Sequence, residues 1–231
     1  MKNKILVVDI GGSNVKLMIS DEEKRRKFPS GPKLLPNETI EQIKEATADW
    51  EYDAVSVGFP SAIGEGSILK EPKNLGKGWL GFEFTELLGK PTKVINDAAL
   101  QALGSYPGSG RMLFLGLGTG LGSALVWPGF VLSLELGFLP YIDNGILEDQ
   151  LGDAGKDRLG KKAWRKEAVR AIEQLKIAFI ADRIVLGGGN AKLVEELPDG
   201  LELGHNRNVY PGGVRLWETE KDGKTPKWRI L

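Results

Sequence analysis

Cysteine is absent from this chain of 231 residues, and histidine occurs once, at His205. Without cysteine there is no disulfide and no thiolate metal site, and a single histidine argues against a zinc site built from imidazole ligands. A hard cation such as Mg²⁺, which takes oxygen ligands, is compatible with this composition. We therefore predict a protein that holds no zinc.

Net charge is absent as well, because 31 Lys and Arg residues balance 31 Asp and Glu residues. Such a chain has no overall field that would draw it onto nucleic acid or an anionic membrane. No apolar run approaches the ~20 residues of a membrane helix, and the run at Ile5–Val8 stops at Asp9, too early for a signal peptide. We predict a cytoplasmic protein that binds neither nucleic acid nor membranes.

Glycine, in contrast, is in excess, with 31 residues, or about 13% against a usual ~7%. The hydrophobic share of 41% and the charged share of 27% are ordinary for a globular protein with a real core. The length exceeds that of one typical compact domain, so two modest lobes or one large unit both fit it. Most glycines fall in a few clusters, where we expect the chemistry.

Residues 1–106 have the pattern of a first α/β lobe. The apolar run Ile5–Ile10 ends at two glycines and precedes the alternating segment Val15–Ile19, which predicts a β-hairpin with Asp9 at its tip. Two more strands are predicted at Ala54–Phe59 and Lys93–Ile95. Two helices are predicted at Ile40–Ala46, where Thr39 and Gln42 could form a capping box, and at Ala98–Leu103. A loop at Pro107, Gly108 and Gly110 then marks the boundary of the lobe.

Residues 107–231 repeat this pattern in a second α/β lobe. Strand, glycine turn and strand recur at 112–127, which suggests an internal duplication. A long helix is predicted to follow at Lys161–Ala178. After it come a strand at Arg183–Leu186, a glycine turn at Gly187–Gly189 and a helix at Asn190–Glu196. In the charged tail from His205, Gly212 and Gly213 resemble a loop before a short helix, and the tail could pack back on the first lobe.

Two glycine turns are candidates for phosphate binding. In Asp9-Ile10-Gly11-Gly12-Ser13-Asn14, glycines let the backbone approach an anion closely, with Mg²⁺ beside Asp9. In Leu117-Gly118-Thr119-Gly120-Leu121-Gly122-Ser123, backbone N–H groups and the Thr119 hydroxyl could face phosphate oxygens. A strand-like segment follows the second turn, which argues against a dinucleotide-binding turn, and it has no P-loop lysine. Both could also be plain tight turns.

Polar groups at strand ends are candidates for a polyol site. At Asn96-Asp97 a carboxylate could accept a hydroxyl proton and a carboxamide could bind a neighbouring hydroxyl, although the pair also suits a helix cap. Glu135 and Glu148 could bridge further hydroxyls or be solvated surface groups. The turn Gly187–Gly189 leaves room for a base or ribose, or simply starts a helix.

Four basic residues recur every four positions, which on a helix would give one stripe that a polyphosphate chain could follow. A solvated helix face is the more common fate of such residues. The four are Arg158, Lys162, Lys166 and Arg170.

In this order, the motifs resemble those of the ROK group of bacterial sugar kinases, and most closely those of polyphosphate glucokinases. The resemblance covers approximately Lys4 to Leu197, and each motif is weak alone. It rests on both glycine hairpins, Gly58-Phe59-Pro60, Asn74-Leu75 with Trp79, Asn96-Asp97, Glu135-Leu136-Gly137, Glu148 and Gly187–Gly189. It implies the two-lobed actin-like ATPase (ribonuclease H-like) α/β fold, with an active-site cleft between the domains, and a homodimer.

The resemblance also implies a glucokinase that transfers a phosphoryl group from polyphosphate, ATP or both to the sugar 6-hydroxyl. Asp97 would be the general base, and Asn74, Asn96, Glu135 and Glu148 would hold the other hydroxyls. Mg²⁺ would lie at Asp9. The donor's phosphates and nucleotide would be held by Asp9, Gly11, Gly12, Ser13, Asn14, Lys16, Gly118, Thr119, Gly120, Gly188 and Gly189.

Two departures from the family pattern leave alternatives open. Phe138 stands where the family usually has histidine, and the cysteine-rich zinc segment of many members is missing. The loss of a polar partner for the sugar makes the hexose uncertain. A sugar sensor without catalysis is the first alternative, and an actin-like ATPase or assembly protein without a sugar site is the second.

Overall fold

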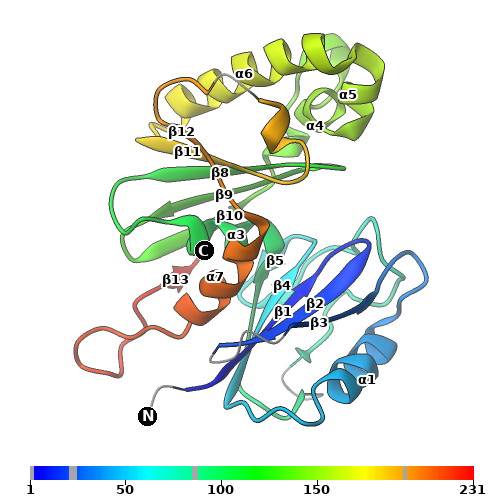
Figure 1. Ribbon diagram of the computed structural model, residues 1–231, viewed down its shortest axis with the longest axis vertical. Coiled ribbons are helices and arrows are strands. Elements are labelled where there is room, and N and C mark those ends of the chain that lie inside the picture. The colour runs from blue at the N-terminus through cyan, green and yellow to red at the C-terminus, as the bar shows by residue number, and fades with distance from the viewer. Residues whose placement is uncertain (1–2, 21–24, 85–87, 195–196) are drawn as a thin grey trace.

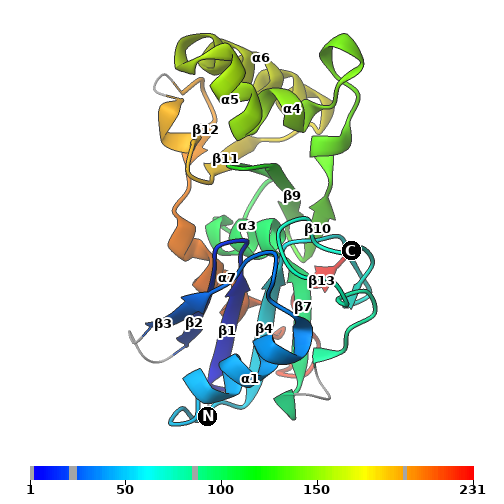
Figure 2. The same ribbon diagram turned by 90° about the vertical axis from the view of Figure 1, so that its right-hand side faces the viewer.

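The first lobe is built on a five-stranded sheet in the computed structural model, which describes residues 3–20, 25–84, 88–194 and 197–231. Its order is β3-β2-β1-β4-β7 (Figure 2), and β4 and β7 run parallel to β1. The carboxyl ends of β1, β4 and β7 therefore meet at one edge of the sheet. The strands are β1 (Ile5–Ile10), β2 (Asn14–Ile19), β3 (Arg25–Pro29), β4 (Ala54–Phe59) and β7 (Thr92–Asn96).

One face of this sheet is covered by helix α1 (Pro36–Ala46) and by an aromatic cluster from the loop after β4. The cluster packs Phe59 against Trp79 with ring centroids 4.9 Å apart, and Trp79 is fully buried. The same loop carries a small ribbon, β5 (Ile63–Gly64) and β6 (Ser67–Ile68). This loop, held by its aromatic side chains, brings residues 60–74 to the edge where β1, β4 and β7 end.

The second lobe repeats the topology of the first. Its sheet has the order β12-β11-β8-β9-β10-β13, in which β10-β9-β8-β11-β12 matches β3-β2-β1-β4-β7 in direction and neighbours. Both predicted hairpins are confirmed, as β1–β2 and β8–β9. The strands are β8 (Met112–Leu117), β9 (Leu121–Trp127), β10 (Phe130–Leu134), β11 (Arg183–Gly187), β12 (Leu201–Leu203) and β13 (Arg229–Ile230).

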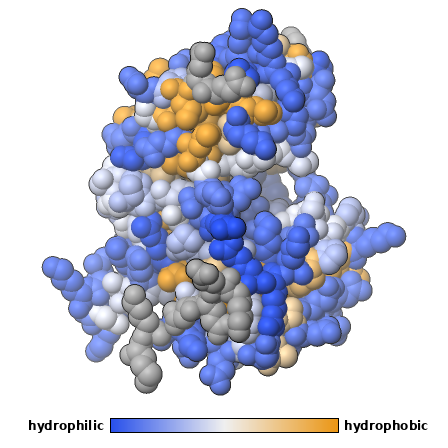
Figure 3. Space-filling view, in the orientation of Figure 1, coloured by the Kyte–Doolittle hydropathy of each residue, from blue (hydrophilic) through white to orange (hydrophobic). Residues whose placement is uncertain are grey.

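Three helices cover the outer face of the second sheet: α4 (Leu147–Leu151), α5 (Asp153–Leu159) and α6 (Lys161–Ala178). Helix α6 is amphipathic, and its buried residues, including Trp164 and Ile172, face β8 and β11 through a shared apolar core. The face shown in Figure 3 is mostly hydrophilic and carries an apolar area on this lobe. None of the helices in the described ranges is long and apolar enough to cross a membrane.

Two helices lie between the sheets, α3 (Asp97–Ser105) and α7 (Val209–Arg215), as Figures 1 and 2 show. Helix α3 packs on β4 and β7 of the first sheet and on β8, β9 and β10 of the second. Helix α7 packs on α3 and on β1 and β4, so the segment after His205 returns to the first lobe. A single apolar core joins these helices to both sheets.

Glycines let these two helices approach to backbone contact. A Cβ atom on Gly104 would lie 1.7 Å from the carbonyl oxygen of Asn208, and one on Gly212 would lie 1.9 Å from that of Leu100. A Cβ atom on Gly213 would meet Val7 of β1 at 2.6 Å. The prediction of a loop at Gly212 and Gly213 is therefore wrong, because α7 needs glycine at its packed positions.

Two further predictions are wrong in detail. Helix α1 begins at Pro36, and Glu38, not Gln42, accepts a bond from the backbone N–H of Leu35, while Thr39 lies inside the helix. The predicted helix at Asn190–Glu196 is one 3-10 turn at Ala191–Leu193, and residues 195–196 lie outside the described ranges. Further 3-10 turns occur at Leu136–Phe138, Ile142–Asn144 and Asn206–Asn208.

Candidate active site in the interlobe cleft

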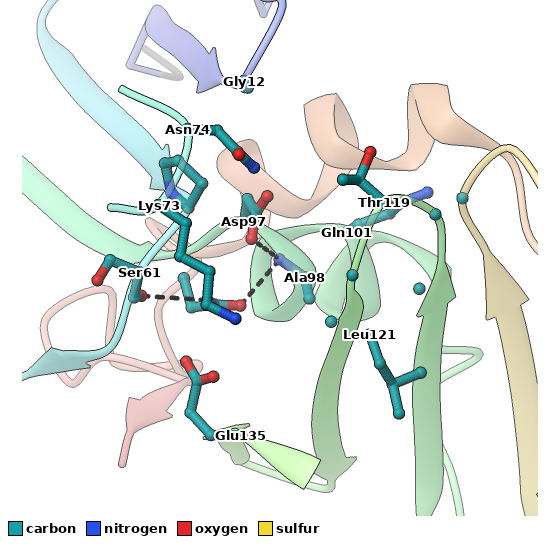
Figure 4. A pocket seen from close by; sticks show the side chains of 18 of the residues that line it. Gly12, Ser61, Lys73, Asn74, Asp97, Ala98, Gln101, Thr119, Leu121 and Glu135 are labelled. Carbon is teal, nitrogen blue, oxygen red and sulfur yellow. Dashed lines mark hydrogen bonds between the residues drawn. The ribbon is translucent and has the colours of Figure 1, made fainter. Parts of the chain in front are cut away.

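A cavity of about 660 Å³ opens between the two lobes (Figure 4). Both glycine hairpins, the start of α3 and the loop after β4 line it. Most of the residues predicted from the sequence meet here: Asp9, Gly11, Gly12, Ser13, Lys16, Asn74, Asn96, Asp97, Gly118, Thr119, Gly120, Glu135, Glu148 and Gly188. Asn14 and Gly189 are not among the lining residues.

Asp97 is the first residue of α3 and lies where that helix meets the cavity. Its Oδ1 accepts a hydrogen bond of 2.8 Å from the backbone N–H of Ala98. Burial, the nearby charge of Asp9 and that of Glu135 raise the pKa of Asp97 to about 7, although the Ala98 bond acts in the opposite direction. This carboxyl group can therefore exchange a proton near neutral pH, as a general base must.

Asn96 caps α3, which favours the structural alternative for its side chain. Its Oδ1 accepts hydrogen bonds from the backbone N–H groups of Ala98 (2.9 Å) and Ala99 (3.2 Å), and its Nδ2 donates to the carbonyl of Ser61 (3.1 Å). Only 7% of the residue is exposed. Both ends of the carboxamide are thus engaged, and the cap fixes the position of Asp97 beside it.

The first hairpin presents Asp9 and Lys16 to the cavity. They are directly opposite each other on β1 and β2, and Lys16 Nζ lies 2.9 Å from Asp9 Oδ2. Burial lowers the pKa of Lys16, but the charge and hydrogen bond of Asp9, together with smaller contributions from Tyr210 and Asp97, outweigh this effect and the net pKa is raised. Gly12 lies so close to Asn74 that a Cβ atom would be 2.9 Å from that side chain. Glycine thus lets the hairpin turn reach the loop that carries Asn74.

A magnesium site at Asp9 is compatible with these contacts. Within the described ranges, no group of three or more His, Cys, Asp or Glu residues is arranged to hold a metal ion. Mg²⁺ in phosphoryl-transfer sites needs only one or two carboxylates, since the phosphates and water supply its other ligands. Asp9 meets this requirement with Oδ1, because Oδ2 is paired with Lys16.

The second hairpin turn rests on a polar network that the sequence did not reveal. Gly118 accepts a bond from the backbone N–H of Asp153, and Lys156 binds both Asp153 and Asn190. Hydrogen bonds from Asn190 and Lys156 lower the pKa of Asp153. These residues come from α5 and from the turn after β11, and no spacing in the sequence links them. Together they fix the turn that carries Thr119.

Gly188 lies against this same turn. Its φ of +81° is in the left-handed region, and a Cβ atom would be 2.2 Å from the carbonyl oxygen of Leu117. Only glycine fits there without a shift of the backbone. The glycine turn after β11 therefore meets the second hairpin.

The end of the cavity near Glu135 and Glu148 also carries two lysines that the sequence reasoning missed. Glu148 Oε2 accepts a bond of 3.1 Å from the backbone N–H of Leu121, and Oε1 forms a 2.7 Å ion pair with Lys73 of the other lobe. Burial raises the pKa of Glu135, and Glu148 adds to the rise while Lys70 and Lys73 oppose it. The charges of Lys70 and Lys73 thus offset those of the two glutamates.

The predicted basic stripe is broken. Arg158 belongs to α5, and Gly160, with φ of +75°, separates it from α6. Arg158 donates to Gln150, and Arg170 is paired with Glu167 and bonded to Tyr141. Lys162 and Lys166 remain as exposed residues on α6. The helix surface therefore does not present one continuous row of free cations.

Comparison with known proteins supports the fold that this geometry indicates. No family model matches the chain, and no curated protein matches its sequence. The chain is similar in structure to an inorganic polyphosphate/ATP-glucomannokinase from Arthrobacter sp. strain KM, with 24% identity and a TM-score of 0.79 over 92% of this chain and 97% of that one.

Two other solved structures show the same likeness. A ROK family glucokinase from Streptomyces griseus, in complex with glucose and AMPPNP, is 18% identical with a TM-score of 0.71, over 92% of this chain and 98% of that one. A ROK family transcriptional regulator, a homolog of the E. coli MLC protein, is 16% identical with a TM-score of 0.67, over 93% and 77%. The chain thus has the two-lobed actin-like ATPase fold of the ROK sugar kinases.

Proposed function

We propose that the protein is a sugar kinase that transfers a phosphoryl group to the primary hydroxyl of a hexose, with Asp97 as general base. The observation that carries this proposal is the position of Asp97: it lies in the cavity lined by both glycine hairpins, and its pKa is about 7. The solved structures similar to this chain include a polyphosphate/ATP-glucomannokinase and a glucokinase in complex with glucose and AMPPNP. A hydroxyl group is a weak nucleophile, and a positioned base removes its proton as the bond to phosphorus forms.

The residues that bind the sugar and those that bind the donor lie at different ends of the cavity. Asn74, Glu135 and Glu148 bind the sugar's other hydroxyls, while the backbone N–H groups of both hairpin turns bind the donor's phosphates. Lys16 adds a positive charge beside them. Mg²⁺, when bound with the phosphates at Asp9, supplies further neutralisation of the charge that develops in transfer. Closing of the lobes excludes water that would otherwise compete with the sugar.

The donor is polyphosphate, ATP or both. Similarity to a polyphosphate/ATP-glucomannokinase favours polyphosphate, and the turn after β11 brings Gly188 to the cavity, where a nucleotide could lie. The exposed Lys162 and Lys166 are the part of the basic stripe that could contact a longer phosphate chain.

The decisive experiment is an activity matrix of two donors, ATP and polyphosphate, against a panel of hexoses, together with the Asp97→Ala variant. We expect turnover with at least one pair, and we expect Asp97→Ala to lower kcat by about 10²–10⁴-fold, the usual contribution of a positioned base. Near-normal turnover by Asp97→Ala, with sugar binding intact, would reject the role of Asp97. The absence of turnover for every pair would reject the kinase.

A sugar sensor without catalysis is the second candidate. It is favoured by Phe138, which removes a polar group from the cavity, and by similarity to a ROK transcriptional regulator. A sensor would bind sugar, as calorimetry can measure, and consume neither donor. Sugar phosphorylation by the purified protein would eliminate it.

A further inference from the structure

Lys73 lies in the cavity beside the residues that we assign to the sugar. Figure 4 shows its side chain extending from the loop after β4 into the cavity, in the direction of Glu135. It directly precedes Asn74, it lines the cavity, and 61% of its side chain is exposed. A cation at this point faces any acceptor that Asn74 and Glu135 hold.

Two contacts fix the Lys73 ammonium group. Nζ lies 2.7 Å from Glu148 Oε1, and it also lies 4.8 Å from the centre of the Phe138 ring. Lys70 approaches the same ring at 5.4 Å. Phe138 is 47% exposed even though it is a large apolar residue. A cation over an aromatic face is attracted by the ring, so Phe138 helps to orient Lys73 within the cavity that both residues line.

The ammonium group has donors to spare. It carries three N–H bonds, and the described contacts use one of them, toward Glu148. The other two are free to donate to oxygen atoms of a molecule in the cavity. The charge of Lys73 acts on Glu135, so an oxygen that Lys73 reaches lies at the end of the cavity near Glu135.

We propose that Lys73, held by Glu148 and the ring of Phe138, binds an oxygen of the acceptor sugar and determines which sugar is accepted. This inference rests on the proposed kinase function and adds to it a sugar-binding residue that supplies the polar contact Phe138 cannot make. Since Lys73 and Glu148 come from different lobes, the bound sugar is held by both.

The test uses Lys73→Met, which keeps most of the side-chain length and removes the charge, with Lys77→Met as matched control outside the cavity. A hydrogen bond from a charged donor corresponds to about 10- to 100-fold in binding. We expect Lys73→Met to raise the sugar KM and Kd by this factor and to leave the donor KM unchanged. Lys77→Met should leave the sugar KM and Kd unchanged. Lys73→Arg should restore part of the affinity.

Monodeoxy sugars identify the contact. The penalty of Lys73→Met should disappear for the one deoxy sugar that lacks the hydroxyl bound by Lys73, and persist for the others. Glu148→Gln alone and combined with Lys73→Met separates direct binding from loss of the ion pair: a direct contact leaves a Lys73→Met penalty in the Glu148→Gln background.

The outcomes that overturn this inference differ from those that overturn the kinase. Turnover in the wild type with an unchanged sugar KM in Lys73→Met overturns the role of Lys73 and leaves the kinase intact. Sugar binding without turnover overturns the kinase, and calorimetric Kd values for wild type and Lys73→Met still decide the role of Lys73. Absence of any sugar binding overturns both.

Discussion

Asp97 experiences two opposing electrostatic effects. The N-terminus of α3 favours a negative charge at its first residue, and the Ala98 N–H bonds the carboxylate directly. Burial and the charges of Asp9 and Glu135 disfavour that charge, and they prevail, since the pKa of Asp97 is about 7. The residue is therefore poised between its two protonation states at neutral pH.

The pH dependence of catalysis follows from this pKa. A general base acts in its deprotonated form, so kcat/KM for the sugar should fall about tenfold per pH unit below pH 7 and level off above it. The profile should be recorded at saturating donor between pH 5 and 9. A flat profile down to pH 5 would contradict the assignment of Asp97 as the titrating base.

The same pKa predicts an effect on stability. Above pH 7 Asp97 is charged in the folded and unfolded chains, and the folded state bears the full cost of the buried charge. Below about pH 4 the group is neutral in both states and the cost vanishes. Asp97→Asn should therefore raise the free energy of unfolding at pH 8 by at least about 1 kcal/mol, or roughly 2–4 °C in Tm, with a gain that shrinks toward pH 4.

Thermal unfolding of both proteins at pH 4, 6 and 8 measures this difference. Asp53→Asn, at an exposed loop position that accepts a bond from the backbone of Lys4, is the matched control. A stability change in Asp97→Asn that is the same at all three pH values would contradict the raised pKa.

At the scale of elements, the pairing of α3 and α7 governs where Asp97 lies. These helices meet through Gly104 and Gly212 with no room for a side chain, and α3 begins at Asp97 itself. Any displacement of α3 along its contact with α7 would thus move the carboxyl group in the cavity.

Gly212→Ala tests this contact. The added methyl would overlap the carbonyl of Leu100, so the free energy of unfolding should fall by about 1–3 kcal/mol or more, despite the better helix propensity of alanine. Urea denaturation measures the loss. Gly189→Ala is the control, because its added Cβ atom would have no neighbour within 4 Å. It should change the free energy of unfolding far less. Equal stabilities in both variants would mean that the helices can separate without cost.

The elements that the sequence predicted best are those with strong local signals. Both hairpins, the strand at Ala54–Phe59 and the helix at Lys161–Ala178 have clear periodicity and glycine or proline at their ends. The helix through Gly212 was missed because its glycines serve a contact with α3, which local propensity does not reveal. The segment at Asn190–Glu196 was predicted as a helix, and the structure describes a 3-10 turn at Ala191–Leu193 in it.

The site shows a similar limit. Residues at strand ends, such as Asp9 and Asp97, could be found because parallel strands bring their carboxyl ends together. Lys73, Asp153 and Asn190 could not, because their partners come from the other lobe or from a distant turn. Asn96 was assigned to the sugar with a helix cap as the alternative, and its contacts with Ser61, Ala98 and Ala99 favour the cap.

At the scale of the whole molecule, the last segment of the chain joins the lobes. Ser56 of β4 is fully buried, donates to the carbonyl of Gly213 in α7 at 2.7 Å and accepts from Trp217 Nε1 at 2.9 Å. Lys93 of β7 donates to the carbonyl of Leu216 and lies over the Trp217 ring. The first sheet is thus tied to residues 213–217 by polar contacts as well as by its core.

Ser56→Ala should weaken this tie. It removes two hydrogen bonds and leaves a buried donor and acceptor unpaired, which costs about 1–3 kcal/mol for each group left unsatisfied. We expect lower stability in urea and faster amide exchange in β1, β4 and α7 together. Thr92→Ala, whose hydroxyl bonds only to a surface carbonyl, is the control. Faster exchange confined to α7 would mean that this helix opens independently of the sheet.

The position of α7 on β1 and β4 also bears on how the chain folds during synthesis. The apolar face of the first sheet, which includes Val7, is covered by a helix that the ribosome makes only after the whole second sheet except β13. The first lobe therefore cannot complete its fold when residues 1–106 have emerged from the ribosome. The face of its sheet that α7 covers stays exposed until that helix has been synthesised. A nascent chain stalled before Val209 would present this face to chaperones.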